Sequence, residues 1–325
     1  MTAPTYEDVP DEAVPGEAAP PASGPASPVR RERLGRDGRT QFYRHTVWVR
    51  VGHWLNVLAF CMLLFSGLQI FNAHPMLYWG QKGANAEAGP DHAWLAIGAS
   101  TDAKGVDHGM VRVGSLTVPT TGVFGLSKRP DGSTTYRAFP RWLTLPAATN
   151  LANGRHFHFF FAWLFALNGA AFLAYGFISR HFQRDIGVTK ADVRSIPQSV
   201  VDHARLRHPT GEAATRYNVL QKLAYISVIF VFLPTMVATG LTMSPGFDAF
   251  APWLLDLFGG RQSARSLHFI SAFLTVGFVV VHLVEVVLAG PINEVRSIIT
   301  GWYGIPPDHA PEPAPEPAPL EETPA

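Results

Sequence analysis

Near its C-terminal end the chain reads Leu267-His268-Phe-Ile-Ser-Ala-Phe-Leu-Thr-Val-Gly-Phe-Val-Val-Val-His282-Leu-Val-Glu285, an apolar stretch that carries two histidines. On an α-helix, fourteen residues rise roughly 21 Å and complete nearly four turns, so both imidazoles project from about the same face. A helix this long and apolar is typical of a membrane span, where ionisable groups are costly and usually functional. The stretch therefore predicts two cofactor or metal sites, one toward each side of a membrane, and electron transfer between them.

The composition agrees with a membrane protein. Of the 325 residues, 47% are hydrophobic and 16% charged, whereas soluble chains carry about 25% charged residues. The net charge of +1 gives no reason to expect a nucleic-acid partner. A single cysteine, Cys61, excludes an intrachain disulfide framework and an iron–sulfur cluster ligated by this chain alone. Electron transfer would therefore depend on histidine ligands or on an organic cofactor.

Four apolar stretches are long enough to cross a bilayer. This pattern predicts an all-α membrane protein, a four-helix transmembrane bundle with a periplasmic loop subdomain and disordered termini. Pro234 falls inside the third stretch and is expected to kink that helix. The helices are expected at about 50–72, 156–178, 219–243 and 266–289.

The termini and the basic residues predict the topology. Residues 1–38 and 306–325 are rich in Pro, Ala and Glu without apolar periodicity, so both are expected to be disordered. Seven Lys and Arg lie in residues 30–50 and seven in the loop 179–217. Basic loops stay inside. We therefore expect a multi-pass protein of the cytoplasmic (inner) membrane with both termini in the cytoplasm.

The insertion 73–154 between the first two helices would lie on the periplasmic side. It contains an alternating stretch, Met110–Val118, and a turn signal, Arg129-Pro-Asp-Gly-Ser133, which together predict a small β-hairpin subdomain. The insertion could be a simple surface loop or a docking platform for another protein. Its length outside a four-helix core favours the platform.

The topology sorts four histidines by depth. His53 would lie near the inner end of the first helix and His158 near the outer end of the second, while His268 is outer and His282 inner on the fourth. Two pairs result, His53 with His282 and His158 with His268, each joining different helices. Paired imidazoles on opposite faces of an iron suit one-electron transfer in haem proteins.

Other interpretations of these residues stay open. Each histidine could simply pack or hydrogen-bond between helices, although two matched depths disfavour this for the set. His156 competes with His158, because residues two apart on a helix face different directions. Histidines in loops, His203 among them, are expected to be solvated. The arginines near the predicted ligand depths could pair with haem propionates or snorkel to the interface, namely Arg50, Arg155 and Arg265.

Four ordered motifs carry a resemblance to a known family. The motifs are Gly52-His53-Trp54, Arg155-His-Phe-His158-Phe-Phe-Phe, Tyr217-Asn218-Val-Leu-Gln221-Lys222 and the spacing of His268 and His282. With them the chain resembles, over residues 40–305, the dihaem cytochrome b membrane subunits of the formate dehydrogenase gamma, Ni/Fe-hydrogenase b-type cytochrome and thiosulfate reductase cytochrome b group. The second motif favours His158 over His156. The long insertion looks more like the thiosulfate reductase branch.

The resemblance implies two haems b, with His53, His158, His268 and His282 as axial ligands of the haem iron. It also implies a quinone or quinol site near the inner haem, where Asn218 could hydrogen-bond a quinone oxygen or, alternatively, act as a helix N-cap. The expected function is an electron-transfer subunit, not a stand-alone catalyst.

Such a subunit would connect the quinone pool to a periplasmic redox subunit of the molybdopterin oxidoreductase class. The alternatives are a proton- or metal-relaying transporter and a cofactor-free membrane anchor.

Overall fold

We describe a computed structural model of the protein over residues 31–35, 40–86, 89–129, 131–205 and 217–304. Within these residues four helices are long and apolar enough to cross a membrane. They are α1 (Val47–Phe71), α2 (Leu151–Ile178), the continuous helix α4–η5–α5 (Val219–Thr242) and α8 (Arg261–Leu288). The four-helix transmembrane prediction is confirmed, and the chain is a multi-pass membrane protein.

Three of the four spanning helices begin at polar caps, and all four expose apolar side chains along most of their length. The N-caps Thr46, Asn150 and Asn218 each accept a hydrogen bond from a first-turn backbone N–H, which satisfies donors that the helix leaves free. Only 6% of the apolar window of α2 is buried inside the protein. Apolar surface on this scale is stable only against lipid, because water would disfavour it.

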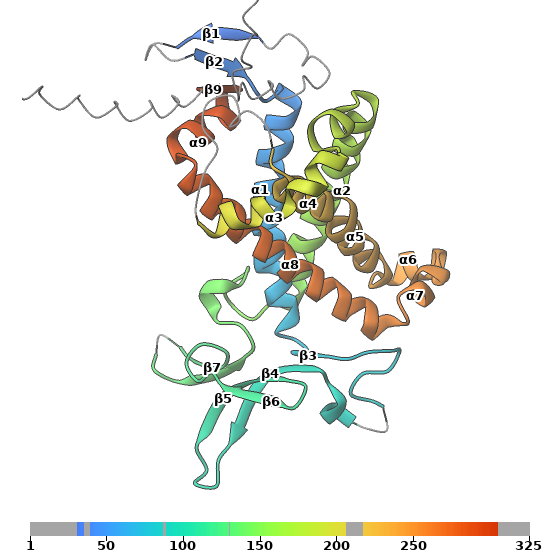
Figure 1. The fold of residues 1–325 in the computed structure, drawn as a ribbon. Helices are drawn as coiled ribbons and strands as arrows, with labels where there is room; N and C mark the ends of the chain where they lie inside the picture. The colour runs from blue at the N-terminus through green and yellow to red at the C-terminus, as the bar shows by residue number, and fades with distance from the viewer. Residues whose placement is uncertain (1–30, 36–39, 87–88, 130, 206–216, 305–325) are drawn as a thin grey trace, which may run out of the picture.

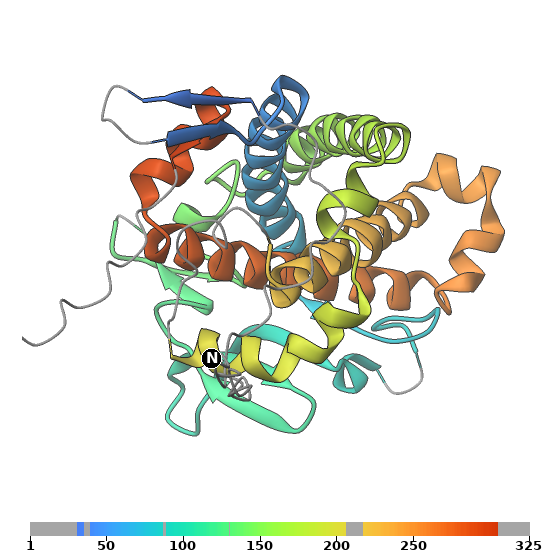
Figure 2. The same ribbon diagram turned by 45° about the horizontal axis from the view of Figure 1, so that its top comes forward.

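The helices pack mainly as two pairs, α1 against α2 and α5 against α8 (Figures 1 and 2). The third helix combines α4 (Val219–Ser227), the π-helical turn η5 (Val228–Phe232) and α5 (Leu233–Thr242). The π turn ends at Phe232, two residues before Pro234, which lacks a backbone N–H and clashes with the preceding turn. The expected irregularity at Pro234 therefore takes the form of locally widened helical hydrogen bonding.

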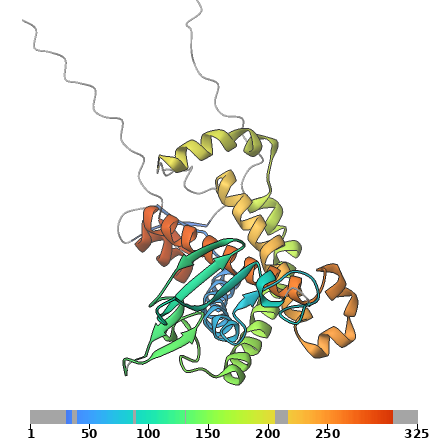
Figure 3. The same cartoon turned by 90° about the horizontal axis from the view of Figure 1, so that it is seen from below.

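The all-α expectation is corrected in part, because the insertion between α1 and α2 folds into strands. A four-stranded antiparallel sheet and a hairpin form what we call the β-subdomain, which lies at one end of the bundle (Figures 1 and 3). The expected strands and turn occur within it. Its elements are β3 (Met76–Leu77), β4 (Leu95–Thr101), β5 (Asp107–Val113), β6 (Leu116–Pro119), β7 (Gly125–Lys128) and β8 (Thr134–Arg137), with two 3-10 turns, η1 (Gly89–His92) and η2 (Arg141–Leu143).

The β-subdomain is bound firmly to the helix ends. Buried side chains from its sheets pack on Leu68 and Phe71 of α1 and form the main hydrophobic core. The buried Arg137 donates hydrogen bonds to Gln69 Oε1 at 2.7 Å and Ala147 O at 2.8 Å. Ser266 of α8 donates to Tyr78 O at 2.6 Å. The subdomain and this end of the bundle therefore form one packed unit.

The opposite end carries a small sheet made from both ends of the described chain, which we call the terminal sheet. β1 (Glu32–Leu34), β2 (Thr40–Tyr43) and β9 (Trp302–Gly304) pair antiparallel in that order, beside α9 (Pro291–Thr300). Glu32–Leu34 were expected within a disordered tail; pairing with β2 orders them. The rest of the predicted N-terminal tail before residue 31 and the tail 306–325 lie outside the described residues.

Short helices complete the connections. α3 (Lys190–Ala204) lies beside α4 and begins with a capping box between Thr189 and Asp192. The π turn η3 (Phe182–Ile186) precedes it, and α6 (Pro245–Phe250) and α7 (Pro252–Leu257) join α5 to α8.

Candidate functional site

Two histidines from different helices face each other near the β-subdomain. The rings of His158 on α2 and His268 on α8 have centroids 6.2 Å apart and an interplanar angle of 64°. Imidazole nitrogens bind metal ions at about 2.0–2.1 Å, so two rings sharing one metal from opposite sides would have centroids about 6 Å apart. The spacing suits one metal between the two rings.

Both rings use Nδ1 for hydrogen bonding inside the protein. His158 Nδ1 lies 3.1 Å from Ser66 Oγ, and His268 Nδ1 lies 3.1 Å from Thr239 Oγ1 and 3.0 Å from Met236 O. Because a carbonyl oxygen only accepts, His268 must donate from Nδ1 to Met236, which leaves Nε2 unprotonated in the neutral ring. A neutral ring with a free Nε2 is the form that binds a metal.

The second pair lies farther along α8, toward the terminal sheet. His282 stacks on Phe278, with ring centroids 6.0 Å apart, and lies within electrostatic reach of His53 on α1. His53 Nδ1 is buried and has no hydrogen-bond partner. A buried imidazole nitrogen without a partner is unfavourable unless a further group satisfies it, so this site can accommodate a ligand.

The remaining sequence candidates separate clearly. His156 is exposed, whereas His158 points into the bundle, where its ring faces His268. Arg265 donates to Met76 O at 2.9 Å and Arg50 to Ile299 O at 2.5 Å, which ties each to a neighbouring segment. Arg155 is exposed and lies over the Phe159 ring.

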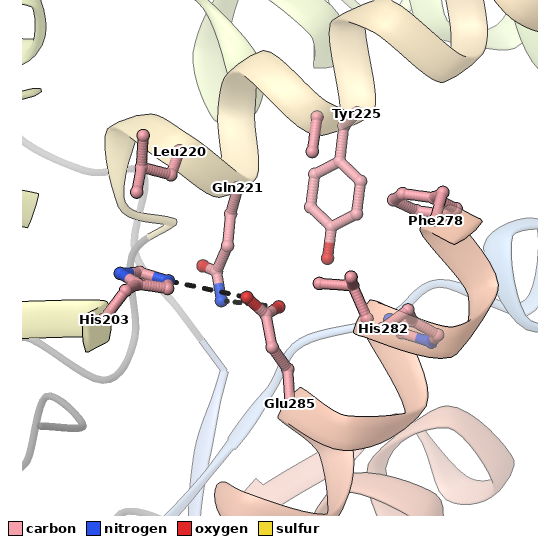
Figure 4. Close-up of a pocket in the computed structure, with 9 residues that line it drawn as sticks. His203, Leu220, Gln221, Tyr225, Phe278, His282 and Glu285 are labelled. Carbon is pink, nitrogen blue, oxygen red and sulfur yellow. Dashed lines mark hydrogen bonds and ion pairs between the residues drawn. The ribbon is translucent and has the colours of Figure 1, made fainter. Parts of the chain in front are cut away.

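A cavity of about 250 Å³ adjoins His282 between α3, α4 and α8 (Figure 4). Glu285 is its central polar residue: Oε1 lies 3.5 Å from His203 Nε2 and Oε2 accepts from Gln221 Nε2 at 3.4 Å. The Tyr225 hydroxyl points toward the cavity in the same view. Its wall is otherwise apolar, formed by Leu220, Ala224, Phe278 and Val281.

Two acid-base groups, His203 and Glu285, face each other in this cavity. His203 Nδ1 lies 2.9 Å from the Ser199 carbonyl, which can only accept, so Nδ1 carries the proton of this hydrogen bond. The other ring nitrogen, Nε2, lies 3.5 Å from Glu285 Oε1. The pair therefore places an imidazole and a carboxyl group side by side next to the apolar wall.

Asn218 is used by the fold. Its side chain accepts from Gln221 N at 2.9 Å while Gln221 Oε1 accepts from Asn218 N at 3.3 Å, a reciprocal capping box. Asn218 therefore occupies the N-cap position that the sequence offered as the alternative to quinone binding. The polar residues that line the cavity are others, chiefly Gln221 and Glu285. Lys222 is bound to Asp192 at 2.9 Å, so it joins α4 to α3.

Three residues of the site escaped the sequence analysis. His203 was expected to be solvated in a loop, but α3 carries it to Glu285. The Thr189-x-x-Asp192 capping signal could have predicted that helix. Ser66 and Thr239 carry no signal individually, because hydroxyls are common in membrane helices; the shared sequence Ser-Gly-Leu and Thr-Gly-Leu is the only indication.

Residues 44–301 match the family model described as prokaryotic cytochrome b561. The chain belongs to this family. It is also 25% identical over 249 residues, 75% of this chain and 90% of the relative, to a putative protein-methionine-sulfoxide reductase subunit YedZ1 of Azospira oryzae. No solved structure matches the chain. The family establishes that the chain is a haem-containing b-type membrane subunit for electron transfer. This assignment is less specific than the dihaem group that the motifs suggested.

The residues of this cytochrome b561 family member fit haem b. A bis-histidine haem needs two facing rings at matched spacing with ring nitrogens free to bind iron; His158 and His268 provide the spacing, and His268 keeps Nε2 free. Glycines stand beside both rings: a Cβ on Gly67 would lie 3.3 Å from His158 Cε1, and one on Gly240 would lie 3.4 Å from His268 Cε1. At the second histidine pair, the fit to haem is supported by the buried Nδ1 of His53, which has no hydrogen-bond partner.

Proposed function

We propose that this subunit binds two haems b and carries electrons across the cytoplasmic membrane between the quinone pool and a periplasmic redox enzyme. The observation that carries the proposal is the spacing of His158 and His268, together with a second histidine pair farther along the same helix α8. His158 and His268 would hold one haem iron, and His53 and His282 the other. Each haem, when bound, supplies reversible one-electron transfer.

The protein would determine the distance and the surroundings of these centres. The fourteen residues from His268 to His282 rise roughly 21 Å along α8, so this one helix would set the spacing across the bilayer. Six-coordinate centres leave no open position for a substrate, which agrees with an electron-transfer role. Glu285 is the only carboxylate in the four spanning helices, which disfavours a proton- or metal-relaying transporter pathway.

We infer that quinone or quinol reacts in the cavity beside His282. The apolar wall of Leu220, Phe278 and Val281 suits a quinone ring, while Gln221 and Glu285 offer hydrogen bonds to its oxygens. A quinone takes up two electrons and two protons to become quinol. The His203–Glu285 pair could exchange protons at one quinone oxygen, and Asn218 would act indirectly by capping α4.

The β-subdomain would be the docking side for the redox partner, because it packs directly on the helix ends nearest His158 and His268. With both termini in the cytoplasm, this side would be periplasmic. The resemblance suggests a molybdopterin oxidoreductase as partner. The name of the Azospira relative suggests a protein-methionine-sulfoxide reductase.

The proposal is tested by the haem content of the purified membrane protein. A reduced-minus-oxidised spectrum should show a b-type α-band, and the haem-to-protein ratio should be two. Replacement of His282 by alanine should remove one haem and leave the other. A ratio of one, or unchanged haem content in His282→Ala, would contradict the two-centre arrangement; an absent α-band would contradict the function as a whole.

A further inference from the structure

Ser66 and Thr239 contact the two facing histidines through the same set of atoms. Ser66 Oγ lies 3.1 Å from His158 Nδ1, and Thr239 Oγ1 lies 3.1 Å from His268 Nδ1. The carbonyl three residues earlier is a second acceptor in each case, from Leu63 for His158 and from Met236 for His268. Two separate helices thus present the same acceptors to two separate rings.

The next residue completes each arrangement. Gly67 follows Ser66 and Gly240 follows Thr239, and a Cβ at either glycine would come within 3.3 Å or 3.4 Å of the Cε1 atom of the facing ring. Contacts of 3.0–3.4 Å are tighter than nearly all real Cβ contacts, so each ring lies directly against the helix backbone. The hydroxyl–glycine pair on α1 therefore contacts the histidine on α2 in the same way as the pair on α5 contacts the histidine on α8.

The hydroxyl protons determine which way the hydrogen bonds run. Ser66 Oγ donates to Met62 O at 2.5 Å, and Thr239 Oγ1 donates to Thr235 O at 2.6 Å. A hydroxyl has a single proton, so with that proton on a carbonyl it offers only lone pairs to the imidazole. Each histidine must then donate from Nδ1, and Nε2 keeps its lone pair.

The pair nearer the terminal sheet lacks this support. His53 Nδ1 is buried without a hydrogen-bond partner, and His282 makes a ring contact with Phe278. The two histidine pairs therefore differ in their ring hydrogen bonds, and only the His158–His268 pair has both rings fixed by helix hydroxyls among the described residues.

We propose that Ser66 with Gly67 and Thr239 with Gly240 are positioning residues that fix His158 and His268 in the Nδ1-protonated form and lower the reduction potential of the haem they hold. The inference rests on the proposed function. A hydrogen bond donated from Nδ1 makes the ligating nitrogen more electron-rich. An electron-rich ligand stabilises the more positive, oxidised iron, so loss of the hydroxyl acceptor raises the reduction potential.

The test uses the full-length protein purified in detergent, with redox titration of the α-band and low-temperature electron paramagnetic resonance. Ser66→Ala and Thr239→Val should each raise the potential of the same single centre, by about tenfold in its reduction equilibrium, or about 59 mV for one electron. The other centre should not move. Thr239→Ser keeps the hydroxyl and should retain the wild-type potential.

Thr242→Val is the matched control. Thr242 is buried on the same helix and donates to Thr239 O at 2.7 Å, and its hydroxyl makes no hydrogen bond to a histidine of the described residues. If a hydroxyl variant loses the haem, Gly67→Ala and Gly240→Ala give the second measurement, because they keep both hydroxyls and should still change the resonance g values of that same centre.

The outcomes are distinct. This inference would be overturned, while the proposed function stands, if Ser66→Ala and Thr239→Val keep the wild-type haem content and the wild-type reduction potentials. It would also be overturned if the two variants shift the potentials of two different centres. Unchanged g values in both glycine variants, where those are needed, would overturn it as well. A wild-type protein without a b-type α-band would overturn the proposed function, and this inference with it.

Discussion

His158 of α2 faces His268 of α8 with ring centroids 6.2 Å apart, so this contact joins the α1–α2 helix pair to the α5–α8 pair. If both rings hold one iron, either substitution should remove the same haem. We expect His158→Ala, His268→Ala and the double variant to show equal losses, about half the haem of the wild type. Pyridine haemochrome analysis measures this. His156→Ala is the matched control and should keep full haem content; a larger loss in the double variant would argue against a shared centre.

The second pair gives a complementary prediction. His53→Ala should remove the haem that His282→Ala removes, because His53 lies within reach of His282 and its Nδ1 lacks a protein partner. Combining His53→Ala with His268→Ala should remove both haems. The absorbance and redox titration of the remaining α-band distinguish the two centres. Retention of both haems in His53→Ala would contradict this pairing.

Quinone chemistry should depend on the His203–Glu285 pair without affecting haem binding. We expect Glu285→Gln and His203→Gln each to lower the rate of haem reduction by a soluble quinol by about 100-fold or more, the usual contribution of a positioned proton-transfer group. Stopped-flow absorbance measures the rate. His181→Gln is the control, because His181 also pairs with a carboxylate, Asp185, yet does not line the cavity. Equal rates of haem reduction in all three variants would show that His203 and Glu285 take no part in the reaction with quinol.

The attachment of α3 to α4 should depend on Asp192. Burial raises the pKa of this carboxyl, but hydrogen bonds from the Thr189 backbone and Lys222 outweigh it, so the pKa lies below the ordinary 3.8. A lowered folded-state pKa stabilises the protein above the unfolded-state pKa, and this contribution is lost as the pH falls through the folded value. We expect Asp192→Asn to slow quinol oxidation at neutral pH, by displacing His203.

The same variant should also remove the part of the acid sensitivity below about pH 4 that Asp192 contributes. Thermal unfolding measured between pH 3 and pH 7 would show a smaller pH dependence for Asp192→Asn than for the wild type. An identical pH dependence in the two proteins would show that the carboxylate contributes nothing to stability.

Gly125 should be required for the β-subdomain. Its φ is +78°, and a Cβ there would lie 1.8 Å from the Gly98 carbonyl oxygen, so the two sheets could not approach. Gly132 has a φ of +82° with nothing within 4 Å of its Cβ. We expect Gly132→Ala to cost about 1–2 kcal/mol of backbone strain and Gly125→Ala about 1–3 kcal/mol more from overpacking. Thermal unfolding and limited proteolysis compare the two.

The position of the spanning helices could be predicted from the sequence, because each helix satisfies its own backbone hydrogen bonds and its apolar side chains face lipid. Length and hydropathy are local properties, so Leu267–Glu285 and the other three stretches were located within a few residues. The strands around Met110–Val118 were also predicted, from alternation and turn residues. The pairing of Glu32–Leu34 with β2 was missed. These two short strands belong to a sheet that β9, at the other end of the described chain, completes, and a two-stranded hairpin alone is marginally stable.

Helical periodicity alone places His268 and His282 on one face of one membrane helix. The neighbours of each ring depend on how the helices pack: Thr239 and His158 lie at one end, and the cavity with Glu285 and His203 at the other. Gln221 illustrates the difference, because its capping box with Asn218 is local in the chain, whereas its hydrogen bond to Glu285 joins two helices. Contacts between helices depend on how their faces pack, and that packing is a property of the whole bundle.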